Sequence, residues 1–561
     1  MQDLVRAWRS FRAQPWSERS RLIRQLARHA GAHGVRSALH RLRHQGAASA
    51  AISDGYEAWC EAHTPTPAIL VRMRADADCF TYRPLVSIIT PVYNTDPQWL
   101  EACADSVVAQ VYPHWQWSLG NDGSTRADTI AALERIAARD SRIIVSHAPV
   151  NGGIAAASNL ALSRAEGEWV ALMDSDDALL PHALFRMVEH LNRPGGRPDV
   201  VYSDEDKLDL DGRRCEAYFK PDWSPDLFLS NMYVCHLLMA RRALVHEVGA
   251  FRTAFDFSQD YDLMLRLMER ASRIDHVADI LYHWRKLPQS GASVGDAKPA
   301  AHVAGRRALQ DYLDRRGVAG EIEDAGPAGF YRVRYRLTRQ PLVSIVTSGV
   351  TARERLGRLV TATAWLRVEL VDDASAATGD YLLFVGRDVT PADGVWLEAL
   401  LEVAEQPGVG VSAPRILDHR GRLHDIGLVL GGGVLAARPL SGWPAQHGGY
   451  FGNAIAIRNV AAVGGSCLLT PRAVWDALGG FEPTLSPDAR AVDYSLKARE
   501  AGYRVAVTPW STLVIESGRE RELSIGADDA ARLGRRWGTS VEADPYHNPN
   551  LPKYDLYPRM G

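Results

Sequence analysis

The fold is decided by the stretch Leu85-Val86-Ser87-Ile88-Ile89-Thr90-Pro91-Val92-Tyr93-Asn94. Its apolar run is typical of a buried strand, and Pro91 predicts the end of that strand. Working outward along the chain, we predict helices over 99–110, 130–138 and 155–164, and strands over 115–119, 142–146 and 168–173. Such regular alternation predicts an α/β fold with a mostly parallel, Rossmann-like sheet that helices cover on both faces.

The composition limits the class of protein. A length of 561 residues predicts about three domains of roughly 100–200 residues each. The net charge of −3 gives no reason to expect binding to nucleic acid, and six singly placed cysteines disfavour a zinc knuckle or a disulfide framework. No apolar run approaches the roughly 18–20 residues that cross a bilayer, and the N-terminus has no signal-peptide core. We therefore expect a cytoplasmic protein.

The N-terminal segment has a different charge from the rest of the chain. Residues 1–50 contain ten arginines and only two acidic residues, a charge of +8. We expect residues 1–83 to form a basic helical arm. Two interpretations are open: peripheral contact with the anionic inner face of the cytoplasmic membrane, or a solvated helical cap on the next domain.

The opening stretch occurs twice in the chain. Pro84-Leu85-Val86-Ser87-Ile88-Ile89-Thr90 recurs as Pro341-Leu342-Val343-Ser344-Ile345-Val346-Thr347, and Gly249-Ala250-Phe251 corresponds to Gly479-Gly480-Phe481. A period this long indicates a duplicated domain rather than a solenoid. We expect a first domain over residues 84–325 and a second copy over residues 326–561.

An acidic cluster, Asp174-Ser175-Asp176-Asp177, follows the strand predicted over 168–173. Carboxylates this close repel one another unless a cation compensates their charge. Alternate residues of an extended segment project the same way, so Asp174 and Asp176 could share Mg²⁺ or Mn²⁺, which bind oxygen ligands. The alternative is an acidic turn in which Asp177 caps the next helix.

Further polar residues follow the other predicted strands. Tyr93 and Asn94 come after the first strand, Asp122 after the second, and Asn151-Gly152-Gly153 opens the helix that contains Asn159. Ligands of such sheets bind at the carboxyl ends of the strands. Asp122 could accept a hydrogen bond from the imide N–H of uracil or thymine, Tyr93 could stack on the base, and the glycine turn suits phosphate or ribose.

The order of these motifs resembles the inverting family 2 glycosyltransferases of the GT-A fold. The resemblance covers about residues 84–317 and extends through Gln259-Asp260-Tyr261-Asp262 and Leu281-Tyr282-His283-Trp284-Arg285. Tyr202-Ser203-Asp204-Glu205-Asp206-Lys207 is similar to the subtype that builds bacterial O-antigen and rhamnan polysaccharides. The resemblance implies tandem GT-A domains after the helical segment.

The resemblance also implies roles for individual residues. Asp260 is the expected general base, although an ion pair of Asp260 and Asp262 with Arg266, one helical turn on, is the alternative. The expected metal ligands are Asp174, Asp176 and His283. Acceptor or diphosphate contacts are expected from Asp262, Trp284, Arg285, Asp204 and Glu205. Nucleotide contacts are expected from Pro91, Tyr93, Asn94, Asp122, Asn151, Gly153, Asn159 and Asp174.

The second copy lacks several of these residues. Asp174 aligns with Gly386, Ser175 with Arg387 and Asp260 with Ala491. We expect this copy to be degenerate and catalytically silent.

The implied function is metal-dependent, inverting transfer of a sugar from a UDP- or dTDP-sugar to a growing polysaccharide or lipid-linked glycan. A bifunctional transferase with two active sites and a non-catalytic glycan-binding scaffold are the alternatives. A sugar nucleotidyltransferase is disfavoured, because Pro91-Val92-Tyr93-Asn94 stands where those enzymes have a Gly-rich phosphate loop.

Overall fold

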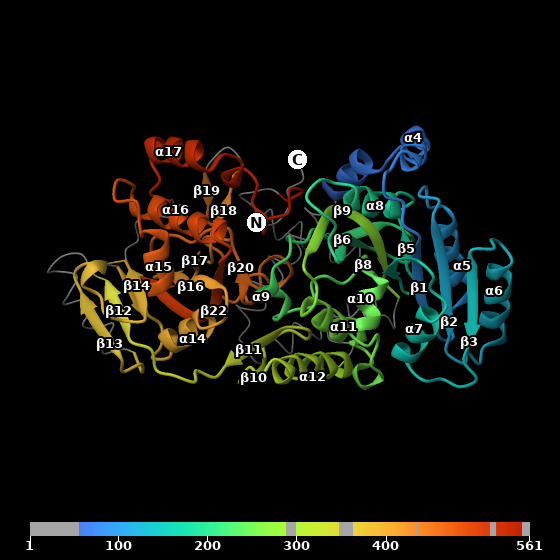
Figure 1. Cartoon of the computed structure of the whole chain (residues 1–561), viewed down its shortest axis with the longest axis horizontal. Helices are drawn as coiled ribbons and strands as arrows, with labels where there is room; N and C mark the ends of the chain where they lie inside the picture. Colours follow the sequence, from blue (N-terminus) through green and yellow to red (C-terminus); the bar gives the residue numbers. More distant parts are fainter. Residues whose placement is uncertain are drawn as a thin grey trace, which may run out of the picture.

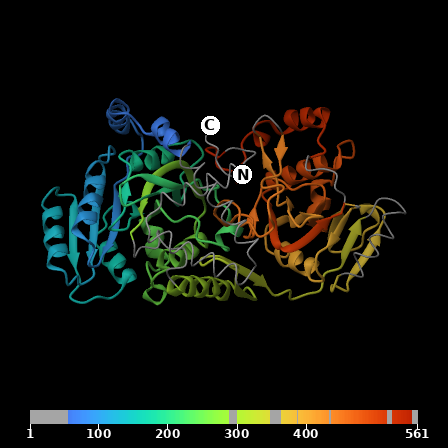
Figure 2. The same cartoon turned by 180° about the vertical axis from the view of Figure 1, so that it is seen from behind.

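The computed structural model describes residues 55–287, 299–346, 363–386, 388–431, 435–516 and 523–551. They form two α/β bodies side by side, the first blue to green and the second yellow to red, joined by helix α12 and the hairpin β10–β11 (Figures 1 and 2). Each body contains one nine-stranded sheet. The predicted α/β fold class is confirmed.

The first sheet has the strand order β3-β2-β1-β4-β8-β6-β9-β5, with β7 paired to β6. It is parallel from β3 to β4, whereas β8 runs antiparallel to both β4 and β6. The strands are β1 (Val86–Val92), β2 (Trp115–Asn121), β3 (Ile143–His147), β4 (Trp169–Leu172), β5 (Ala178–Leu179), β6 (Val200–Leu208), β7 (Arg214–Tyr218), β8 (Leu238–Arg241) and β9 (Ile274–Arg285). The helices are α4 (Pro67–Asp78), α5 (Pro97–Val108), α6 (Ala127–Ala137), α7 (Ile154–Leu162), α8 (Ala183–Leu191), α9 (Pro225–Phe228), α10 (Arg242–Glu247), α11 (Gln259–Met268) and α12 (Pro299–Arg315).

Strand β1 lies at the centre of the parallel part, between β2 and β4. The prediction that Pro91 ends this strand is wrong, because β1 continues to Val92 and Pro91 pairs with Gly120. Strand β4 pairs with β1 only as far as Ile89. Beyond Ile89, the edge of β1 that faces β4 has no paired strand. Pro91 lacks a backbone N–H, and at this position no hydrogen bond to β4 is lost.

The second sheet has the order β13-β12-β14-β21-β16-β22-β15, which repeats the first sheet without a counterpart of β3. Strand β17 pairs with β16 as β7 pairs with β6. The remaining strands are β10 (Gly320–Asp324), β11 (Tyr331–Tyr335), β12 (Val343–Val346), β13 (Val368–Val371), β14 (Tyr381–Val385), β15 (Val389–Pro391), β16 (Val409–Asp418), β17 (Leu423–Asp425), β18 (Val429–Leu430), β19 (Ala436–Ala437), β20 (Arg458–Asn459), β21 (Cys467–Pro471) and β22 (Arg504–Ile515). The helices are α14 (Trp396–Ala404), α15 (Arg472–Leu478), α16 (Pro487–Glu500) and α17 (Ala527–Trp537).

The hairpin β10–β11 packs into the core of the first body through Ile322, Tyr331 and Val333. Its turn contains residue 325, where we expect the first domain to end. The core of the first body also takes up Ala456 from the second. Apolar packing is therefore continuous from one body to the other.

Polar contacts also stabilise the junction between the two bodies. Arg504 Nε lies 2.9 Å from Asp226 Oδ2, and Asn459 Nδ2 donates to that oxygen at 2.6 Å. Nearby, Asn548 donates to Asp204 at 2.8 Å. Because Asp226 and Asp204 are buried, these bonds fix how the two bodies meet.

Most of the predicted basic arm, residues 1–54, lies outside the described residues. Residues 55–63 and α4 are helical, and α4 packs near α8. In the part of the chain that is described, none of the helices has the length and apolar character needed to cross a membrane.

Candidate active site

Two cavities meet at the carboxyl edge of the parallel strands in the first body. The larger has a volume of about 790 Å³ and the smaller about 500 Å³. Asp174, which follows β4, lines both of them, as do Pro91, Phe257 and Trp284. One carboxylate therefore lies where two separate ligands could approach each other.

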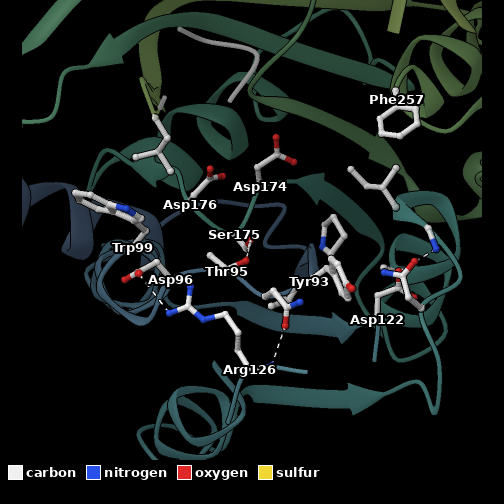
Figure 3. A pocket seen from close by; sticks show the side chains of 18 of the residues that line it. Tyr93, Thr95, Asp96, Trp99, Asp122, Arg126, Asp174, Ser175, Asp176 and Phe257 are labelled. Atoms are coloured by element: carbon white, nitrogen blue, oxygen red, sulfur yellow. Dashed lines mark hydrogen bonds and ion pairs between the residues drawn. The ribbon is translucent and has the colours of Figure 1, made fainter. Parts of the chain in front are cut away.

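The larger cavity contains the acidic cluster. Asp174 and Asp176 both line it, and Figure 3 shows their carboxylates at the centre of the cavity. Asp177 is fully buried instead, and its oxygens accept hydrogen bonds from Tyr282 Oη at 2.6 Å and Arg285 N at 2.8 Å. Burial, followed by the charges of Asp176 and Asp174, raises the pKa of Asp177 well above its usual range. The buried member of the cluster thus orders the loop, while the other two carboxylates face the cavity.

A histidine that the sequence motifs do not indicate completes this cluster. His236 Nε2 lies 3.9 Å from Asp174 Oδ2, and ligand atoms of Asp174, Asp177 and His236 all lie within 4.8 Å of one another. The side chain of Asp174 is 41% exposed and that of His236 is 13% exposed, so a solvated ion could reach both. Carboxylates with one imidazole suit a divalent cation.

The far end of the larger cavity contains Asp122 and Tyr93 (Figure 3). Asp122 Oδ1 accepts Gly152 N–H at 2.8 Å and Oδ2 accepts Gly153 N–H at 2.9 Å. These bonds join the end of β2 to the start of α7 and leave further lone pairs on each oxygen. The ring of Tyr93 is 50% exposed, and Asn151 and Pro91 also line this cavity. The arrangement offers a flat ring and an anionic acceptor to a planar ligand.

Two other predicted nucleotide residues have structural partners. The Oδ1 atom of Asn94 accepts hydrogen bonds from the backbone N–H groups of Thr125 and Arg126 at 2.8 and 3.0 Å. These bonds hold the loop after β2 against the loop after β1. Asn159 exchanges two hydrogen bonds with the backbone of Phe251. Asn94 lines the larger cavity, whereas Asn159 lines neither cavity.

Asp260 and Asp262 are separated by their surroundings. Asp260 lines the smaller cavity from the first turn of α11, accepts the N–H of Tyr261 at 2.8 Å and has no ion-pair partner among the described residues. Burial raises its pKa, and the charge of His236 opposes that shift. Asp262 is fully buried and pairs with Arg252 and with Arg266, the latter at 2.7 Å. The ion pair considered from the spacing therefore belongs to Asp262 alone.

The structure places several other predicted residues away from the cluster of Asp174, Asp177 and His236. His283 pairs with buried Asp206, on the neighbouring strand β6, and lines neither cavity. Asp204 pairs with His276 at 2.9 Å, and Glu205 pairs with buried Lys220 at 3.1 Å. These contacts explain why three acidic residues in a row lie within a strand: each has its own buried cationic or polar partner.

Residues of the last predicted motif lie at the edge of the larger cavity. Trp284 lines both cavities. Arg285 donates from Nε to the carbonyl of Asp176 at 2.8 Å, and its guanidinium lies 4.6 Å from the ring centroid of Trp99. Arg285 therefore supports the backbone of the acidic loop.

The second body has no equivalent of this cluster in its described residues. The strand registers Val86 with Trp169 and Val343 with Tyr381 make Gly386 the counterpart of Asp174 and Asp388 that of Asp176. Arg387 falls outside the described residues. Ala491, aligned with Asp260, is fully buried.

Comparisons with known proteins agree with this geometry. Residues 87–249 match the model of glycosyl transferase family 2. The uncharacterized protein y4gI of Sinorhizobium fredii is 35% identical over 526 residues, covering 83% of this chain and 58% of that protein. O-antigen biosynthesis protein RfbC of Myxococcus xanthus is 32% identical over 547 residues, covering 88% and 42% respectively. The chain thus spans about half the length of the curated relatives it matches.

Among solved structures, S. aureus TarS 1-349 is 21% identical, with 41% of this chain and 65% of that chain covered, at a TM-score of 0.31. A score this low adds no weight to the assignment. The family match over residues 87–249, together with the carboxylates at one sheet edge, places the first body of this chain in glycosyl transferase family 2. The family predicted from the motifs is confirmed.

Proposed function

We propose that the chain is a metal-dependent, inverting glycosyltransferase that moves a sugar from a nucleoside-diphosphate donor to a growing polysaccharide or a lipid-linked glycan. One observation carries this proposal: the cavity lined by Tyr93 and Asp122 and the cavity lined by Asp260 meet at Asp174. The similarity to an O-antigen biosynthesis protein supports a polysaccharide product.

The donor occupies the larger cavity in this proposal. Tyr93 and Asp122 hold a uracil or thymine base, since Asp122 keeps lone pairs for the imide N–H. Asp174 and His236, together with Asp176 of the larger cavity, would hold Mg²⁺ or Mn²⁺. Once bound, that cation neutralises the negative charge that builds up on the departing diphosphate.

The acceptor occupies the smaller cavity, beside Asp260. As an acceptor hydroxyl oxygen attacks the anomeric carbon, Asp260 takes its proton and the bond from that carbon to the diphosphate oxygen breaks. Attack opposite the leaving group inverts the anomeric configuration. The raised pKa of Asp260 makes it a stronger base than an exposed carboxylate.

The basic N-terminal segment suits work on an acceptor anchored in a membrane. Its charge of +8 favours contact with anionic lipid headgroups. Co-sedimentation of the full chain with anionic but not neutral vesicles, at low but not high salt, would support this part of the proposal.

The proposal is tested by thermal-shift screening of nucleoside diphosphates and nucleotide-sugars with and without Mn²⁺ or Mg²⁺. A ligand that binds only the folded state raises its stability. We expect stabilisation by uridine or thymidine diphosphate in the presence of the cation, and its loss in Asp176→Asn. Failure of every pyrimidine diphosphate to stabilise the protein would contradict the proposal.

A further inference from the structure

One wall of the smaller cavity comes from the second body. Phe451 lines it together with Asp260, His302 and Tyr331, although those three belong to the first body and its connection. Phe451 is 37% exposed, which is unusual for an aromatic side chain held between two packed bodies. The candidate acceptor cavity is therefore completed by a residue from the degenerate copy.

The ring of Phe451 is held in a defined position. It stacks on Tyr218 with ring centroids 3.8 Å apart and an interplanar angle of 9°. The neighbouring Tyr450 donates its hydroxyl to the carbonyl of Ala217 at 2.8 Å and accepts the N–H of Phe219 at 2.9 Å. Strand β7 of the first sheet thus anchors this segment of the second body.

The backbone of the segment has an uncommon conformation and is closely packed. Phe451 has φ 44° and ψ 41°, a left-handed conformation that a bulky side chain rarely adopts. A Cβ on Gly452 would lie 2.2 Å from the ring of Phe330, in the turn of the hairpin β10–β11. Strain of this kind persists where the surroundings enforce it, and it gathers at ligand sites.

We propose that Phe451, backed by Tyr218, is a platform on which a pyranose ring of the acceptor glycan stacks. This inference rests on the proposed function and names the substrate that the smaller cavity takes. Tyr218 covers one face of the Phe451 ring, and the exposed remainder faces the cavity that contains Asp260. The negative face of an aromatic ring attracts the C–H groups that line one side of a pyranose.

The role of the second body follows from this placement. It contributes to acceptor selection, although Gly386 stands at its counterpart of Asp174. Phe451 is a specificity-determining residue, because it touches the acceptor away from the reacting hydroxyl.

The test compares Phe451→Gly with Phe451→Tyr in the full chain. Glycine removes the ring and adopts a positive φ without strain, so the variant adds no backbone strain to the loop, and the unchanged affinity for UDP reports that the fold is intact. Tyrosine keeps the stacking face. Each protein, loaded with UDP and Mn²⁺, is applied to an array of immobilised bacterial oligosaccharides, and UDP affinity is measured separately by calorimetry.

We expect Phe451→Gly to weaken oligosaccharide binding about tenfold while UDP affinity stays unchanged, and Phe451→Tyr to bind as the wild type does. Equal glycan binding by Phe451→Gly and wild type overturns the inference, and so does the absence of any glycan binding by a wild type that binds UDP. If UDP with Mn²⁺ fails to bind, the proposed function itself is contradicted. UDP binding therefore distinguishes failure of the proposed function from failure of the inference about Phe451.

Discussion

Asp260 and Asp262 lie two residues apart on α11, and their surroundings predict opposite consequences of the same substitution. Asp260→Asn removes a proton acceptor from the smaller cavity, so transfer should fall about 10²–10⁴-fold with the melting temperature and UDP affinity nearly unchanged. Steady-state kinetics with a donor found by the screen would measure this. Retained activity in Asp260→Asn would remove Asp260 from the mechanism.

Asp262→Asn is the matched control for that variant. It takes the carboxylate away from buried Arg266 and from Arg252. The free energy of unfolding should fall by about 3–5 kcal/mol, because buried positive charge loses its partner. Urea denaturation checks this, and an unchanged midpoint would mean that the ion pair is not structural.

The sequence placed some cavity-lining residues at the carboxyl ends of strands, where local pattern determines their position. Asp174 and Asp176 follow β4 directly, and Asp122 follows β2, so local pattern was enough. His236 could not be predicted in this way. It precedes β8, whose antiparallel register with β4 pairs Leu172 with Leu238 and so brings His236 next to Asp174. That pairing is long-range, and a single histidine before a strand has no recognisable spacing.

At the scale of elements, the start of α7 supports the donor end of the larger cavity. Gly153 has φ +93° and donates to Asp122, and a Cβ there would lie 2.0 Å from Asp256 Oδ2. We expect Gly153→Ala to cost about 1–3 kcal/mol more than Gly196→Ala, because it also displaces a hydrogen-bonded carboxylate. Gly196 has φ +88° with open space around it, so that variant reports the backbone strain alone.

Chemical denaturation of both glycine variants gives this difference, and calorimetry should show weaker UDP binding only in Gly153→Ala. Equal stability losses at the two glycines, with equal UDP affinity, would mean that the contact with Asp256 does not shape the site.

Local sequence pattern predicted the bounds of the first helices and strands but not the order of the later strands in the sheet. The first strands and helices were predicted within a few residues of their observed bounds because each has a continuous apolar face. The order of β8, β6, β9 and β5 was not predicted. Strand β6 contains Asp204, Glu205 and Asp206, whose buried partners come from β9, the irregular segment after β7 and the C-terminal segment. Its sequence therefore resembles a solvated loop.

At the scale of the whole molecule, the two sheets share a strand order, but in the described residues of the second body Gly386 stands where the first body has Asp174. Asp388→Asn should leave sugar transfer unchanged, whereas Asp176→Asn, its counterpart in the first body, should reduce it at least a hundredfold. Both variants are compared with the same donor and acceptor. Loss of one of two distinct transfers in Asp388→Asn would instead establish a bifunctional enzyme.

Buried His276, which pairs with buried Asp204 and with the exposed carboxylate of Asp222, predicts how the free energy of unfolding depends on pH. Burial alone would lower the pKa of His276, but the charge and hydrogen bonds of Asp204, together with Asp222, outweigh it and raise the pKa above its ordinary 6.5. A raised pKa means that the folded state binds this proton more tightly. The stabilisation is complete below pH 6.5 and is lost as pH rises through the raised value.

Urea denaturation between pH 6 and 9 should therefore show the wild type losing stability relative to His276→Gln as the pH rises. Asp204 also accepts a hydrogen bond from Asn548 Nδ2 at 2.8 Å. The packing of the C-terminal segment, which joins the two bodies, should therefore weaken over the same pH range. Parallel pH curves for the two proteins would mean that His276 is not charged in the fold.

The most direct test of the central claim, inverting transfer with Asp260 as the base, is the anomeric configuration of the released sugar. Proton NMR can follow slow hydrolysis of the stabilising nucleotide-sugar, with water in place of the acceptor, before the sugar mutarotates. We predict that the first anomer formed is opposite to that of the donor, that the reaction requires Mn²⁺ or Mg²⁺, and that it is lost in Asp260→Asn. A first-formed sugar with the configuration of the donor, or hydrolysis that persists in Asp260→Asn, would contradict the account.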